Sequence, residues 1–190
     1  MTDMVPESFV RALDRFESVL TAVAPDRWDA PSPRAGWNAA DVAGHVIGNL
    51  RAIEAYATGR DEEDSASRPQ AVAGADAVAE WHTSRTEMMA VLGPVALARP
   101  VPLPWGQMRL GGFLERHPME FLVHTWDLAK ATGQAAGLDP ELVRAALGPA
   151  REFAPVARIS GLVGPEFAVP EDADDLTRLL ALLGRRDPGG

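Results

Sequence analysis

Apolar side chains recur at helical spacing in six stretches of this chain, and residues that favour turns separate the stretches. This spacing predicts helices over residues 6–24, 39–58, 71–93, 115–133, 139–154 and 172–184. Residues 94–112 instead hold four prolines and alternate Val and Leu, which predicts an irregular arm with a short edge hairpin. Long helices with almost no strand signal predict an all-α bundle.

The ends of the second and fourth predicted helices carry residues with strong backbone preferences. Asn38 is a good N-cap for the second helix, with Asp41 three residues further on, and Gly59 can end that helix. Pro118 removes a backbone hydrogen bond and disfavours helical geometry at the residue before it. The fourth helix is therefore expected either to begin near Pro118 or to kink there. Residues 60–70, RDEEDSASRPQ, are typical of a solvated linker.

Three polar side chains interrupt the apolar face of the fourth predicted helix, ERHPMEFLVHTWDLAKATG. On a helical wheel, His117, Glu120 and His124 share the face that carries the large apolar residues. A buried carboxylate or imidazole is costly unless it is paired, hydrogen-bonded or bound to a metal, so this face needs a partner from elsewhere in the chain. His45 can provide it if the second and fourth helices are neighbours. Asn49 lies on the same face as His45 and is a candidate to support it.

Two imidazoles and one carboxylate are a common ligand set for a divalent cation that keeps a position open for water or substrate. His45, Glu120 and His124 are therefore candidate ligands of a divalent metal. The alternative is a half-exposed ion pair between Glu120 and His124, with His45 hydrogen-bonded separately in the core. His117 is expected to support the site or face a substrate, or else to lie on the surface. Asp127 can hold the second nitrogen of a ligating imidazole, or pair with a surface arginine.

Composition narrows the chemistry. The chain has 190 residues and no cysteine, which excludes disulfides, thiolate metal sites and a cysteine nucleophile. Any thiol chemistry must therefore use sulfur from a small molecule. The net charge of −9 and the lack of a Lys/Arg-rich block disfavour nucleic-acid binding. The first residues lack the features of a signal peptide, and no apolar run is long enough for a membrane span, so we expect a cytoplasmic protein.

Three segments carry a combination of residues that is fairly specific to one family. They are WNAADVAGHVIGNL at 37–50, EFLVHTWDLAKATG at 120–133 and FAVPEDADDLTRLLALLGR at 167–185. Together they resemble the metal-binding proteins related to the mycothiol-dependent maleylpyruvate isomerase N-terminal domain, which are DinB-like four-helix bundles. The resemblance implies a bundle over residues 1–135 with a divalent metal at one end, bound by His45, Glu120 and His124. We expect residues 136–190 to form a helical extension packed on this bundle within a single domain.

The resemblance also implies a function. In this family a low-molecular-weight thiol such as mycothiol or bacillithiol coordinates the metal and reacts with an electrophile, because a bound cation lowers the pKa of a coordinated thiol. We therefore expect a thiol-dependent isomerase or S-transferase, with zinc as the favoured metal and nickel or iron as alternatives. The competing hypotheses are a metallohydrolase, a non-catalytic or regulatory metal-binding bundle, and a metal-free bundle that binds a protein partner.

Overall fold

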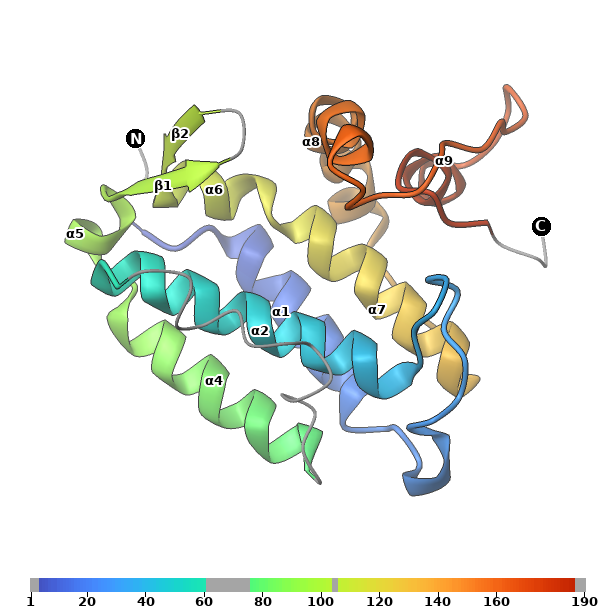
Figure 1. The fold of residues 1–190 in the computed structure, drawn as a ribbon, viewed down its shortest axis with the longest axis horizontal. Helices are drawn as coiled ribbons and strands as arrows, with labels where there is room; N and C mark the ends of the chain where they lie inside the picture. The colour runs from blue at the N-terminus through green and yellow to red at the C-terminus, as the bar shows by residue number, and fades with distance from the viewer. Residues whose placement is uncertain (1–3, 61–75, 104–105, 187–190) are drawn as a thin grey trace.

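The computed structural model describes residues 4–60, 76–103 and 106–186. Four long helices form the main bundle, namely α1 (Glu7–Leu20), α2 (Ala39–Thr58), α4 (Ala77–Val91) and α7 (Pro118–Thr132). Helix α1 packs on α7, and α2 lies between α4 and α7 and contacts both (Figure 1). The predicted all-α, DinB-like bundle is confirmed.

Capping residues fix where the helices begin. The Asn38 side chain accepts a hydrogen bond from the Asp41 amide, and the Asp41 carboxylate accepts one from the Asn38 amide, so both groups at the start of α2 are satisfied. Gly59 ends this helix with a φ of 75°, as predicted. Asp76 caps α4, which begins at Ala77. Residues 61–75 lie outside the described part of the chain, and with them most of the expected linker and the first turn of the predicted third helix.

The core of the bundle is formed by the apolar faces of these four helices. The aromatic rings of α1 reach two neighbours, since Phe9 packs edge-on against Phe121 of α7 and Phe16 packs against Trp81 of α4. All four rings are buried. Each such side chain contributes roughly 1.5–3 kcal/mol by leaving water, so these contacts hold α7 in a fixed position relative to the other helices.

The predicted edge hairpin is present. Strand β1 (Pro100–Leu103) pairs antiparallel with β2 (Gly106–Arg109), after the short helix α5 (Pro94–Leu97) and directly before α6 (Leu110–Arg116). Helix α6 begins within the segment for which the sequence predicts an irregular arm, and it reaches only residues 115–116 of the fourth predicted helix. Helix α7 begins at Pro118, which is one of the two arrangements expected there. His117 is the residue between the two helices.

Two further helices cover the outward face of α7. Helix α8 (Pro140–Ile159) and helix α9 (Asp175–Leu182) pack on each other, and α8 packs on α7 through a second apolar cluster (Figure 1). From α7 this cluster takes Met119, Leu122, Val123 and Trp126. Helix α8 continues past its predicted end at residue 154 and through Pro155, because its inner face stays buried.

No helix among the described residues combines the length and the apolar character that are needed to span a lipid bilayer.

Candidate metal centre

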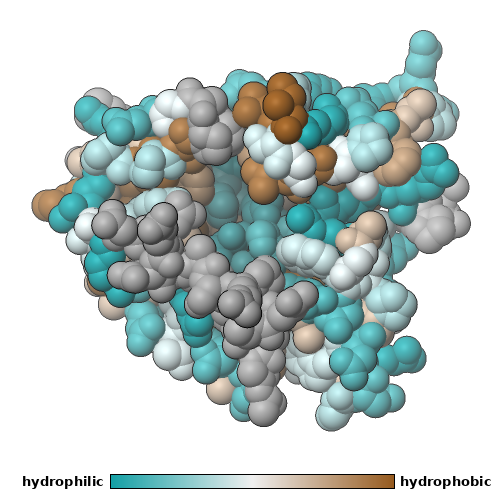
Figure 2. Space-filling view, in the orientation of Figure 1, coloured by the Kyte–Doolittle hydropathy of each residue, from teal (hydrophilic) through white to brown (hydrophobic). Residues whose placement is uncertain are grey.

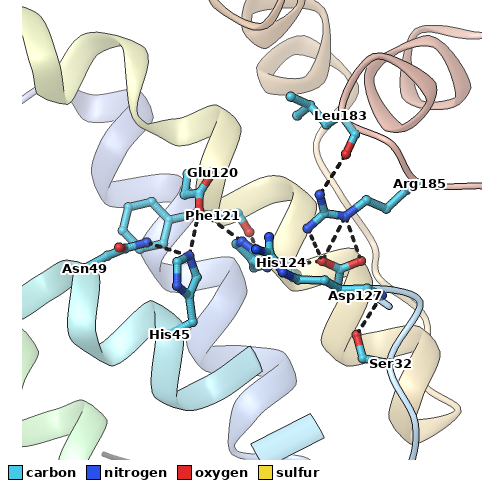
Figure 3. Close-up of polar contacts among 11 residues, drawn as sticks. Ser32, His45, Asn49, Glu120, Phe121, His124, Asp127, Leu183 and Arg185 are labelled. Carbon is cyan, nitrogen blue, oxygen red and sulfur yellow. Dashed lines mark hydrogen bonds and ion pairs between the residues drawn. The ribbon is translucent and has the colours of Figure 1, made fainter. Parts of the chain in front are cut away.

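Helices α2 and α7 bring three of the sequence-predicted side chains together. His45 projects from the first half of α2, and Glu120 and His124 follow one another along α7 (Figure 3). The Glu120 Oε1 atom lies 2.8 Å from His45 Nε2 and 3.0 Å from His124 Nε2. One ligand atom from each residue lies within 4.8 Å of the others. Helices α2 and α7 are therefore neighbours, which is the condition under which His45 was expected to meet Glu120 and His124.

The three side chains differ in their exposure to solvent. His124 is 1% exposed, whereas His45 and Glu120 keep 25% and 23% of their side-chain surface accessible. The Trp37 ring lies beside both imidazoles, with its centroid 5.1 Å from that of His45 and 6.0 Å from that of His124. The cluster is thus closed by protein on one side and open on the other.

Asp127 forms a second layer behind His124. Its Oδ2 atom lies 3.1 Å from His124 Nδ1 and accepts a hydrogen bond of 2.8 Å from Arg185 Nη2 (Figure 3). The contact with His124 is an ion pair by distance, and its direction departs from that of a linear hydrogen bond. Asp127 and Arg185 are both buried. Asp127 therefore makes both contacts that were open from the sequence, one with the second nitrogen of His124 and one with an arginine. The arginine is buried and not on the surface.

The charges of these groups depend on one another. Burial by itself raises the pKa of Glu120, but His124 and His45 hold the pKa of that carboxyl well below its usual range. Burial opposes the charge of His124, yet Glu120 and Asp127 raise its pKa above the usual value. Burial lowers the pKa of His45, with a smaller contribution from the nearby His124. Without a cation, the cluster is an ionised carboxylate beside one imidazole that tends to be charged and one that tends to be neutral.

The remaining two predicted residues border the cluster on the side of α6. Asn49 Nδ2 lies 3.4 Å from His45 Nε2. The His117 ring lies between Phe113 and Phe121, at centroid distances of 4.5 and 5.2 Å. Its Nε2 atom is buried and has no hydrogen-bond partner in the described part of the chain, so His117 is placed in the wall of the site and not on the open surface. Burial lowers the pKa of His117 to about 4, so this imidazole is neutral at physiological pH.

A cavity of about 640 Å³ opens directly onto the cluster. Its walls come from α2, the hairpin, α6, α7, α8 and the segment after α9, and they are mainly apolar. Figure 2 shows a recess in this face of the molecule, with hydrophilic atoms at its base and hydrophobic atoms along its upper edge. The volume suits a small organic molecule, and the polar groups of the cluster lie at one place in an otherwise apolar wall.

Comparison with known proteins agrees with this architecture. The model of one family, described as the mycothiol maleylpyruvate isomerase N-terminal domain, matches residues 9–129. The chain belongs to this family. The match includes all four helices of the bundle and the three clustered side chains, whereas α8 and α9 lie beyond it.

Two relatives extend the similarity past the isomerase N-terminal domain. An uncharacterized protein of Mycobacterium tuberculosis, found in two strains, is 33% identical over 162 residues, which cover 84% of this chain and 80% of the relative. The crystal structure of a histidine-to-alanine mutant of the mycothiol-dependent maleylpyruvate isomerase superposes with a TM-score of 0.53 and 17% identity, over 77% of this chain and 67% of that one. The second comparison shows a shared fold.

Three residues beside the centre of this family member were not singled out from the sequence. Trp37 and Arg185 occur in the segments that carry the family resemblance, but the sequence predicts no role at the centre for them or for Arg34. Trp37 lies eight positions before His45 and outside α2, the helix whose spacing indicated His45. Arg185 is 58 residues from its partner Asp127. Helical periodicity relates residues within one helix, so it gives no signal for either contact.

Proposed function

We propose that this chain binds a divalent metal through His45, Glu120 and His124 and uses a small thiol of the mycothiol type to transform a small electrophile. The observation that carries the proposal is the convergence of the three ligand atoms at the wall of an apolar cavity. Two ligand atoms of a tetrahedral zinc site lie about 3.3 Å apart when each bond is near 2.0 Å. The observed separations of 2.8 and 3.0 Å are close to that value.

The chemistry of the donors fits a metal of this kind. A carboxylate and two imidazoles are a known ligand set for catalytic zinc, and nickel or iron also accept them. Asp127 faces His124 Nδ1, which favours the tautomer that leaves Nε2 free to bind a cation. The Glu120 carboxylate is ionised and His45 tends to be neutral, and both are the forms that bind metals. His124 tends to be charged in the absence of a cation, so a metal would displace the proton on its Nε2 atom.

The surroundings of the centre suit thiol chemistry. A bound divalent cation would supply one effect, a lower pKa of a thiol beside it. The chain has no cysteine, so the sulfur would come from a separate molecule in the cavity. In an isomerisation the thiolate would add to one carbon of a double bond, whose π electrons move to the neighbouring carbon, and it would be expelled as the double bond re-forms. In an S-transfer the thiolate would displace a leaving group, which departs with the electrons of the broken bond, and the new carbon–sulfur bond would remain. The apolar walls would keep water away from the reacting groups.

The family membership supports the same function, because the named domain and the superposed enzyme both come from a mycothiol-dependent isomerase. We also propose a cytoplasmic location, where small thiols are kept reduced. A metallohydrolase has weaker support. Among the described residues that line the cavity the carboxylates are Glu120, which would bind the metal, and Glu152, which pairs with Arg116. Neither is available as a general base, and the low pKa of His117, about 4, makes its buried imidazole a weak base.

Elemental analysis of protein purified without an affinity tag tests the metal. We expect about one equivalent of metal in the parent and in His82→Ala, and a large loss in His124→Ala. His82 is the matched control because it is an exposed histidine on α4, where it lies 3.8 Å from Glu17. A parent that takes up no metal even after reconstitution would overturn the proposal.

A second assay separates an enzyme from a non-catalytic metal-binding bundle. Conjugation of monochlorobimane with mercaptoethanol is followed with the metal-loaded parent, the chelated parent and His124→Ala. Acceleration by the loaded parent alone supports metal- and thiol-dependent chemistry. Full metal content with no acceleration for any of several thiols and electrophiles would favour the non-catalytic alternative.

A further inference from the structure

Arg34 stands beside the three clustered side chains without a carboxylate partner. It lies in the loop before α2 and lines the cavity. Within residues 4–60, 76–103 and 106–186, its guanidinium makes no ion pair, and its contact is with the Trp37 ring, 3.9 Å from Cζ to the centroid. The other two arginines of the cavity wall are paired, Arg116 with Glu152 and Arg185 with Asp127.

Trp37 holds this guanidinium close to the clustered imidazoles. The Trp37 ring is nearly parallel to that of His124, at an angle of 13°, while Arg34 packs over the same indole. A guanidinium stacked on an indole keeps its N–H groups at its edge, where a planar carboxylate can accept two of them. Arg34 is half-buried, and burial together with the nearby Arg185 lowers its pKa, although Glu120 and Asp127 act in the opposite direction. An anion in the cavity would further favour the charged guanidinium.

The local charges also favour an anion. Asp127 and Arg185 neutralise each other. Glu120 is the remaining carboxylate of the cluster, and it can balance only one of the two charges of a divalent cation. Arg34 adds a further positive charge. A metal-loaded cavity would therefore carry an excess of positive charge within apolar walls, where an opposite charge is attracted more strongly than in water.

We infer that Arg34 is an anion-binding residue of the cavity, which selects a ligand with a carboxylate group. This inference rests on the proposed function, since it concerns a second contact for a ligand at the same centre. The carboxylate could belong to the thiol or to the electrophile. Both sources have the same chemistry at Arg34, and they are distinguished by separate titrations.

The first titration uses cobalt-loaded protein, whose absorption spectrum changes when sulfur joins the metal. Mercaptopropionate and its amide have nearly the same size and differ in charge. If the carboxylate belongs to the thiol, the parent binds the acid more tightly than the amide, and Arg34→Gln reduces this preference by roughly tenfold, the value of one charged hydrogen bond. Arg34→Lys keeps part of the preference.

The second titration adds butyrate or butyramide to protein that already holds mercaptoethanol, and is followed by calorimetry. Binding of butyrate alone, lost in Arg34→Gln, assigns the carboxylate to the electrophile.

Arg116→Gln is the matched control, because Arg116 lines the same cavity but already pairs with Glu152. It is expected to keep the preference for the acid. All variants should take up cobalt as the parent does. A parent without a cobalt spectrum would overturn the proposed function and this inference with it. A parent that binds cobalt and thiol but prefers the carboxylate in neither titration, or a preference that survives Arg34→Gln, would overturn the assignment of Arg34 alone.

Discussion

At the scale of single residues, Asp127 connects the candidate centre to the C-terminal part of the chain. One of its oxygens faces His124, and both receive hydrogen bonds from Arg185, which follows α9. Burial by itself raises the pKa of Asp127, but His124 and Arg185 hold it below the usual value, so the carboxyl is ionised. A buried charge of this kind is tolerated because its partners are fixed around it.

Replacement of Asp127 by Asn tests this connection. The variant leaves the buried charge of Arg185 without compensation, so we expect the free energy of unfolding of the metal-free protein to fall by about 3 kcal/mol. We also expect metal affinity to fall by roughly tenfold or more, because His124 loses the group that orients it. Urea unfolding and metal titration measure the two effects. The exposed Asp26→Asn is the control. If the losses of stability and metal affinity in Asp127→Asn were no larger than in this control, the contacts of Asp127 with His124 and Arg185 would have no structural importance.

At the scale of the helices, α1 packs against α4 through a contact that has an apolar part, Phe16 against Trp81, and a polar part. Glu17 of α1 is the polar part of that contact, because its carboxylate accepts hydrogen bonds from Trp81 and Arg85 of α4. Burial by itself raises the pKa of Glu17, yet these two donors hold it below its usual value of 4.5. The carboxylate therefore stabilises the native state in its charged form.

The lowered pKa of Glu17 makes the stability of the folded protein depend on pH. A carboxyl whose pKa is lowered by folding contributes its stabilisation above the unfolded pKa of 4.5, and the contribution is lost as the pH falls through the folded pKa. We expect Glu17→Gln to lower the free energy of unfolding at neutral pH by about 1 kcal/mol. The difference from the parent should shrink as the pH falls below 4.5. Urea unfolding from neutral to acidic pH measures it.

The exposed Glu87 on α4 provides the comparison for this measurement. Glu87→Gln is expected to show little difference from the parent at any pH, since an exposed carboxyl gains little from folding. A difference for Glu17→Gln that stayed constant down to acidic pH would contradict an ionic contribution and indicate a packing effect.

At the scale of the whole molecule, the cavity is assembled from parts that are distant in sequence. Helices α2 and α7 carry the three clustered side chains, while the hairpin, α6, α8 and the segments after α8 and α9 supply much of the remaining wall. Because a metal would bind the native arrangement and not the unfolded chain, its affinity should appear as added stability.

Metal addition therefore tests the assembled site. At a free zinc concentration about one hundred times the dissociation constant, native-state binding adds about 2.7 kcal/mol. For a chain of this size we expect a rise in the midpoint of thermal unfolding of roughly 5–10 °C. Chelation should reverse it. Calorimetry of the parent, His45→Ala and His82→Ala distinguishes this site from weak surface binding, since an equal rise in all three proteins would locate the metal elsewhere.

The sequence by itself determined the helices and the chemistry available to them. Periodicity located the second helix from Ala39 to Thr58, and caps such as Asn38 marked its start, because these signals are local. The same periodicity selected Glu120 and His124 as polar groups on a buried face. The lack of cysteine and the acidic net charge restricted the function classes, since both are properties of composition. The division of the chain near residue 135 and the role of the clustered residues as metal ligands stay predictions.

Only the tertiary structure decided which residues meet. It brought His45 to Glu120, joined Asp127 to Arg185, and placed Arg34 and Trp37 beside the imidazoles. It also extended α8 past residue 154 and through Pro155, because burial of one face in the second apolar cluster outweighs the local preference of proline to end a helix. These contacts join parts of the chain that fold as separate elements. They are set by how helices pack on one another, and no periodicity within one helix encodes that packing.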